Sequence, residues 1–105
     1  MRTGAAYDGP MADRLTEEAV VEALQKSQWT RDGDAIVRDL RFTDFAAAMA
    51  YVNRVAEVAE AANHHPDILV HGWNNVRLTL STHSVGGLTA ADVEMAGRLD
   101  DVPTS

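Results

Sequence analysis

All four histidines of the chain lie between positions 64 and 83. His64 and His65 are adjacent and precede Pro66, while His83 follows Thr82. Histidine has an unperturbed pKa of about 6.5, so its side chain can accept or donate a proton at neutral pH. The pair follows a predicted helix and His83 follows a predicted strand, and the ends of such elements can meet at the rim of a domain. We therefore consider this cluster for acid–base chemistry, against the alternative that the histidines are simply solvated.

Other chemistries are less well supported by the sequence. Neighbouring residues of an extended segment point in opposite directions, so His64 and His65 are poorly placed to chelate one metal ion, and we expect no metal site. Ser84 lies beside a histidine but without a nucleophile-elbow pattern, and Gly86-Gly87 lacks the further residues of a phosphate-binding loop. The chain has no cysteine, which excludes disulfides, thiolate nucleophiles and iron–sulfur clusters.

Composition and charge exclude several classes of partner. A chain of 105 residues accommodates one domain with one core. Sixteen acidic and nine basic residues give a net charge of -7, without any lysine or arginine cluster, so we expect neither a nucleic-acid nor a membrane partner. No apolar stretch approaches the roughly 20 residues of a membrane span. The first thirteen residues contain no apolar run typical of a signal peptide, and we expect a cytoplasmic protein.

The domain organisation follows from local composition. Residues 1–14 contain Gly4, Gly9 and Pro10 and show no periodicity, which predicts a flexible N-terminal arm. Residues 15–102 are predicted to form the domain, and residues 103–105 a short tail.

Two helices are predicted from their capping residues. Thr16 before Glu17 and Glu18 begins a helix that is expected to end near Lys26. Thr89, with Asp92 three positions later, begins a helix that is expected to end near residue 100.

A longer helix is predicted between them. Thr43 and Asp44 supply its start, and Pro66 disfavours helical backbone at His65, so the helix is expected to end near Ala62. Its apolar residues recur at spacings of three and four, and this stripe is expected to face the core: Phe45, Met49, Val52, Ala56 and Ala59.

Alternating residues predict two β-hairpins. The first covers residues 29–42 and turns at Asp32-Gly33. The second pairs residues 68–73, in which Trp73 is expected to pack within the strand, with residues 76–82, and turns at Asn74-Asn75. The predicted fold is therefore α+β, with the order α-β-β-α-β-β-α and a four-stranded antiparallel sheet whose one face is covered by the helices.

Several of these residues together carry a more specific signal. The run from Glu60 to Asp67 contains Glu-x-x-x-His-His-Pro, and residues 73–83 end in Leu-Ser-Thr-His before Gly87-Leu88-Thr89 and Asp92. This combination resembles the pterin-4a-carbinolamine dehydratase family over residues 15–100. The resemblance is extended by Trp29 before the Asp-Gly turn.

The resemblance implies a fold, a reaction and an assembly. Members of this family have the same α-β-β-α-β-β-α order and form homodimers or homotetramers. They remove water from 4a-hydroxytetrahydropterin to give quinonoid dihydropterin, which recycles the cofactor of aromatic amino-acid hydroxylases. This implies a pterin substrate, a pathway link to such a hydroxylase, and a reaction that needs no metal or redox cofactor.

The resemblance also implies site residues. The catalytic set would be His64, His65, His83 and Glu60, where His64 and His83 carry protons, His65 binds and Glu60 orients a histidine or raises its pKa. The substrate-binding set would be Pro66, Thr82, Ser84, Val85, Trp29 and Asp92. The sequence leaves open which histidine is the acid and which is the base.

Other functions are compatible with the same fold. The family includes a dimerisation cofactor of a transcription factor and degenerate assembly chaperones, so a non-catalytic binding, dimerisation or assembly module is the main alternative. Degenerate members are expected to lose active-site histidines, whereas this chain keeps His64, His65 and His83. A further alternative is a pterin-binding role in a molybdopterin or folate pathway.

Overall fold

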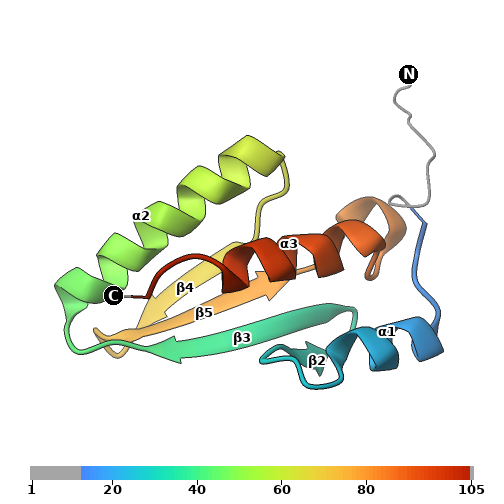
Figure 1. Ribbon diagram of the computed structural model, residues 1–105, viewed down its shortest axis with the longest axis horizontal. Helices are drawn as coiled ribbons and strands as arrows, with labels where there is room; N and C mark the ends of the chain where they lie inside the picture. The colour runs from blue at the N-terminus through green and yellow to red at the C-terminus, as the bar shows by residue number, and fades with distance from the viewer. Residues whose placement is uncertain (1–12, 105) are drawn as a thin grey trace.

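The computed structural model describes residues 13–104 and forms its helices and strands in the predicted order (Figure 1). The elements are α1 (Glu17–Leu24), β2 (Thr30–Asp32), β3 (Ala35–Arg41), α2 (Phe45–Ala62), β4 (Asp67–His71), β5 (Asn75–Leu80), the short 3-10 helix η2 (His83–Val85) and α3 (Ala90–Asp100). The expected arm over residues 1–14 lies outside the described residues except at positions 13 and 14.

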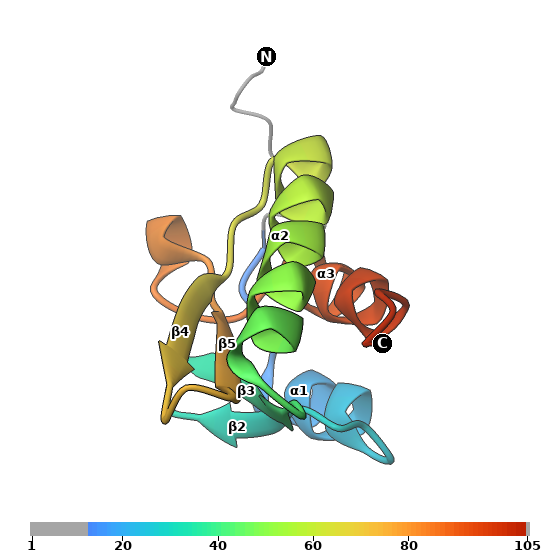
Figure 2. The same ribbon diagram turned by 90° about the vertical axis from the view of Figure 1, so that its left-hand side faces the viewer.

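The sheet joins the two predicted hairpins through their inner strands. Its order is β2-β3-β5-β4 and every neighbouring pair is antiparallel. The three α-helices, α1, α2 and α3, lie together on one side of this sheet (Figure 2). The α+β prediction is therefore confirmed. β2 pairs only with residues 35–37, so within residues 13–104 no strand lies beside residues 38–41 of β3 on that edge.

The core lies between the sheet and the helices. On β5, Val76, Leu78 and Leu80 are fully buried, and they alternate with Arg77 and Thr79, which face the other side of the sheet. This alternation was predicted, and it follows from the two-residue period of a strand.

Local side-chain contacts explain where the helices begin and end. The Thr16 hydroxyl accepts a hydrogen bond from Ala19 N at 3.1 Å at the start of α1, and Asp44 Oδ1 accepts one from Ala47 N at 2.8 Å at the start of α2. α2 ends at Ala62, as predicted, and Asn63 after it has a left-handed φ of 52°. α1 ends at Leu24, two residues before the predicted position.

The predicted core stripe of α2 is largely wrong. The residues buried on this helix are Ala48, Tyr51, Val55 and Ala59. Phe45 is 55% exposed and Ala56 is also exposed, while Met49 and Val52 are half-buried. The helical period was right but the phase was not. Alanines lie on several sides of α2, so the spacing of its apolar residues is compatible with more than one buried face.

The first hairpin turns one residue later than predicted. Asp32 pairs with Ala35, so Gly33 and Asp34 form the two-residue loop instead of Asp32 and Gly33. Gly33 has a φ of 62°, a conformation that glycine adopts without a steric penalty.

The second hairpin turns earlier than predicted, and Trp73 does not pack within a strand. The loop is Gly72–Asn74, and Trp73 at its tip is 60% exposed with a φ of 58°. The buried side chain of Asn74 explains the shift, because its amide donates to the Phe42 carbonyl at 2.9 Å. Phe42 N donates in turn to the Asn74 carbonyl at 2.8 Å, which fixes this loop to the end of β3.

Residues near both limits of the described range form hydrogen bonds to the domain. Arg14 forms an isolated β-bridge with Thr89, and Leu15 N donates to the Leu88 carbonyl at 2.7 Å. In the predicted tail, the Pro103 carbonyl accepts a hydrogen bond from Arg54 Nε at 3.1 Å. Across residues 13–104, no helix has the length and apolar character needed to cross a membrane.

Candidate active site

A buried carboxylate, Asp92, organises the region in which the predicted histidines lie. Asp92 is in the first turn of α3 and is fully buried. Its Oδ2 accepts hydrogen bonds from the Thr89 backbone N–H at 2.9 Å and from the Thr82 hydroxyl at 2.7 Å. Its Oδ1 lies 2.7 Å from Nε2 of His64. The capping contact predicted between Thr89 and Asp92 is thus also a contact that orients a histidine.

This arrangement selects one form of the His64 ring. An ionised carboxylate has no proton to donate, so the proton in the short contact belongs to Nε2 of His64. In the neutral ring the other nitrogen, Nδ1, then carries a lone pair and can accept a proton. The His64 side chain is 23% exposed, so the ring is held by the protein while one side remains accessible. This is the geometry of a general base supported by a carboxylate.

His83 is connected to Asp92 through its chain neighbour Thr82. It is the first residue of η2 and follows Thr82, whose hydroxyl binds Asp92. Thr82 and Gly87 exchange two backbone hydrogen bonds, at 2.9 and 3.4 Å, which close the loop that carries His83. Asp92 therefore links the segment of His64 to the segment of His83.

Glu60 contacts the second histidine of the pair. Its Oε2 lies 2.5 Å from Nε2 of His65, and both side chains are exposed. The contact spans five positions, because α2 ends at Ala62 and the left-handed Asn63 redirects the chain. The resemblance implied that Glu60 orients a histidine or raises its pKa, and in the structure the histidine that Glu60 contacts is His65.

The other predicted residues divide into two groups. Ser84 and Val85 lie in η2 beside His83, and Pro66 is buried directly after the histidine pair. Trp29, in contrast, is buried elsewhere: its Nε1 donates to Asp100 Oδ1 at 2.9 Å. Asp100 is eight residues beyond Asp92 on α3, which corresponds to about 12 Å along the helix. The structure thus places Trp29 away from the histidines of its own chain.

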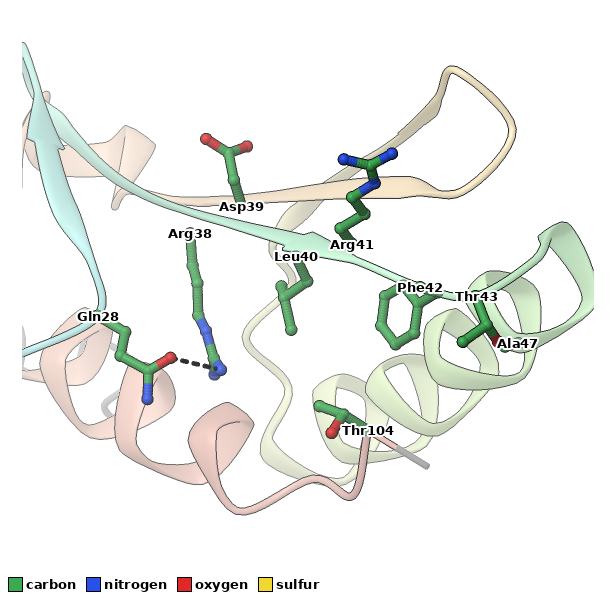
Figure 3. Close-up of a pocket in the computed structure, with 9 residues that line it drawn as sticks. All are labelled: Gln28, Arg38, Asp39, Leu40, Arg41, Phe42, Thr43, Ala47 and Thr104. Carbon is green, nitrogen blue, oxygen red and sulfur yellow. Dashed lines mark hydrogen bonds between the residues drawn. The ribbon is translucent and has the colours of Figure 1, made fainter.

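Two surface pockets differ in volume and in the residues that line them. His64 lines one of about 220 Å³ between the end of α2 and α3, together with Asn63, Glu94 and Arg98. A larger hollow of about 430 Å³ lies under β3, where Arg38, Leu40 and Phe42 point towards the helices (Figure 3). The residues predicted for the site are not among those that line this second hollow.

Metal ligation was not expected from the sequence. Among the described residues, no group of three histidine, aspartate or glutamate side chains is placed to hold a metal ion.

Comparisons with known proteins agree with the resemblance seen in the sequence. The family described as pterin 4 alpha carbinolamine dehydratase matches residues 13–102. A protein of Nocardia farcinica, provisionally named a pterin-4-alpha-carbinolamine dehydratase, is 49% identical over 84% of this chain and 93% of its own length. A protein of Thermomicrobium roseum with the same provisional name is 47% identical over 85% of this chain and 96% of its own length.

Two solved structures are also similar. A transcriptional coactivator/pterin dehydratase from Brucella melitensis superposes with a TM-score of 0.78 at 35% identity, covering 86% of this chain and 98% of that one. A pterin dehydratase-like RuBisCO assembly factor of the alpha-carboxysome gives a TM-score of 0.57 at 23% identity, covering 70% of this chain and 84% of that one. The second likeness concerns the fold alone.

Proposed function

The chain belongs to the pterin 4 alpha carbinolamine dehydratase family, and from this premise we propose that it dehydrates 4a-hydroxytetrahydropterin to quinonoid dihydropterin. The reaction breaks the bond between C4a and its hydroxyl group, which leaves as water after it has received a proton. The proton on N5 is removed as the C4a=N5 double bond forms. The step therefore needs one group that donates a proton and one that accepts a proton.

His64 is the group that we assign as the base. Its Nε2–H is bound to Asp92, which leaves Nδ1 with a free lone pair. When Nδ1 takes the N5 proton, the ring becomes an imidazolium 2.7 Å from a buried carboxylate that stabilises the new charge. Asp92 is fully buried and already accepts further hydrogen bonds, so in this proposal it positions His64 and does not touch the pterin.

His83 is the group that we assign as the acid. Its side chain is exposed at the start of η2, where it can exchange protons with solvent after each turnover. His65, held by Glu60, would bind the substrate, and the wall of the binding region would come from Pro66 and from the backbone of residues 82–85. Each properly placed acid or base contributes a rate factor of about 10²–10⁴.

The observation that carries this proposal is the contact of the buried Asp92 with both His64 and Thr82. Burying a charged carboxylate is unfavourable unless other groups compensate the charge. A merely solvated histidine has no need of such a partner, whereas a histidine that becomes positively charged during the reaction does.

The direct test is a stopped-flow dehydration assay on chemically generated 4a-hydroxytetrahydropterin. Wild type is expected to accelerate the reaction, and His64→Ala and His83→Ala are each expected to lower turnover by at least about a hundredfold. His71→Ala is the matched control, because this fourth histidine is exposed at the far end of β4. A folded wild-type protein that gave no acceleration would reject the enzyme and favour a binding or assembly module.

We further propose that the chain forms a homodimer or homotetramer. Among the described residues, no strand pairs with the outer edge of residues 38–41 of β3, and such edges are usually covered. Exposed apolar side chains, including Phe45 on α2 and Leu69 on the edge strand β4, offer surfaces for a second copy.

A further inference from the structure

We propose that Arg14 is a positioning residue that holds the His83 loop, defined here as residues 82–87, from its outer side. The inference rests on the proposed role of His83 as a proton donor. Arg14 lies outside the sequence segments that suggested the site, and it enters the site region only through the fold.

The side chain of Arg14 lies directly against the backbone of Gly87. A Cβ atom placed on Gly87 would be 2.7 Å from Arg14 Nε and 3.2 Å from both Cδ and Cζ. Real Cβ atoms essentially never approach another atom to 2.7 Å, and contacts of 3.2 Å are unusually tight, so the Arg14 side chain occupies the space that a side chain at position 87 would need. The absence of a side chain at Gly87 is what allows the contact.

The backbone next to Arg14 is fixed to the same segment. Arg14 forms a β-bridge with Thr89, and Leu15 N donates to the Leu88 carbonyl at 2.7 Å. The contact of Arg14 with Asp34 is weaker, at 3.4 Å between exposed side chains, so it contributes little. The Arg14 backbone is therefore fixed by the two residues that directly follow the loop, which brings its side chain to Gly87.

The His83 loop is thus held from two sides. On the inner side, the Thr82 hydroxyl binds the buried Asp92. At its closure, Thr82 and Gly87 exchange backbone hydrogen bonds, and on the outer side Arg14 covers Gly87. The His83 side chain is exposed and makes no hydrogen bond to another described side chain, so its position depends on the backbone of this loop.

This geometry predicts that two different substitutions have the same effect. Gly87 does not have a positive φ, so its backbone accommodates alanine, and the added Cβ would displace only the Arg14 side chain. Arg14→Ala removes that side chain directly. In a double-mutant cycle, Arg14→Ala combined with Gly87→Ala should therefore be no worse than either single variant.

The experiment measures kcat, KM and the ring resonances of His83 in these three variants. We expect kcat to fall about tenfold with little change in KM, because small displacements of a catalytic group reduce the chemical step. The Hε1 resonance of His83, assigned by its loss in His83→Ala, should shift or broaden in all three. Gly97→Ala is the control, since a Cβ there meets nothing within 4 Å, and thermal unfolding establishes that every variant is folded.

The outcomes separate this inference from the proposed function. Unchanged kcat and an unchanged His83 resonance in Arg14→Ala would overturn the role of Arg14, even if His83→Ala is inactive. Strictly additive losses in the double variant would also overturn it. If wild type shows no dehydratase activity, the proposed function fails, and the resonance of His83 alone then decides whether Arg14 holds the loop.

Discussion

His64 and Asp92 are 28 positions apart in the chain, yet their side chains lie 2.7 Å from each other. The two residues come from the segment after α2 and from the first turn of α3, which pack together on the same side of the sheet. The contact therefore exists only in the folded chain, and it converts a helix-capping aspartate into a partner of the candidate base.

Replacing this carboxylate by an amide should abolish most activity. In Asp92→Asn, the side-chain amide can donate to Nε2 of His64, which moves the ring proton to Nδ1 and removes the base. We expect kcat to fall by about 10²–10⁴-fold in the stopped-flow assay, the range for loss of a general base or of its tautomer. The amide oxygen still accepts from the Thr89 N–H, so only the negative charge at the start of α3 is lost. This should cost no more than about 1 kcal/mol, which denaturant unfolding can measure separately.

Asp101→Asn is the matched control for that variant. Asp101 is exposed at the other end of α3, so this substitution removes a charge from the same helix without touching His64. If Asp92→Asn kept wild-type turnover, His64 would not act as an Asp92-supported base.

The contact between Glu60 and His65 should matter less than that of Asp92. Both side chains are exposed, so water can replace the carboxylate. We expect Glu60→Gln to raise KM several-fold and to leave kcat within about threefold of wild type, in keeping with a binding role for His65. Glu57→Gln, on an exposed position of the same helix, should leave both constants unchanged. A fall in kcat as large as that of His64→Ala would instead place His65 in the chemical step.

Sequence patterns predicted the element order well because each signal was local. The caps at Thr16 and Asp44 and the alternation along β5 depend on residues a few positions apart, and the structure confirms them. The face of α2 could not be predicted in the same way. Alanines widen the apolar surface of this helix beyond one stripe, so the side that packs depends on the sheet and on α3.

The candidate site was predicted as a set of residues, while its connections were not. The sequence placed the histidines at the ends of elements, but only tertiary packing shows that Asp92 binds His64 and that Trp29 binds Asp100 instead. Likewise, Trp73 lies in a loop and not in the predicted strand, because the buried Asn74 binds the carbonyl of Phe42 at the end of β3. These two residues are 32 positions apart, so local sequence patterns do not predict their contact.

The misassigned face of α2 leads to a prediction about assembly. Phe45 is 55% exposed, and a second copy of the chain would bury it. We expect light scattering of wild type at micromolar concentration to give a dimer or tetramer, and Phe45→Ser to weaken that assembly by about 2 kcal/mol per copy. Val21→Ser is the control, since Val21 on α1 is 59% exposed but adjoins glutamates. A monomeric wild type would contradict the proposed oligomer.

The hydroxyl of Tyr51 predicts an unusual stability change. Tyr51 is fully buried against Phe42, with ring centroids 5.1 Å apart, and among the described residues its hydroxyl has no hydrogen-bond partner. Tyr51→Phe keeps the ring contact and removes a buried hydroxyl whose hydrogen bonds to water in the unfolded chain are not replaced in the fold. We therefore expect urea unfolding at pH 7 to show that this variant is more stable by about 1 kcal/mol.

The same variant should change the response to alkaline pH. Burial raises the pKa of the Tyr51 phenol, and the nearby Arg38 opposes this only in part. The folded state thus holds the phenol proton more tightly than the unfolded state does. The stability that depends on this proton is fully present below the unfolded pKa of about 10. It is lost as the pH rises from there through the raised folded pKa. Tyr51→Phe should show a smaller loss of stability above pH 10 than wild type.

A Tyr51→Phe variant that is less stable than wild type at pH 7 would mean that the hydroxyl binds an internal water. An alkaline stability profile equal to that of wild type would mean that Tyr51 does not titrate with unfolding.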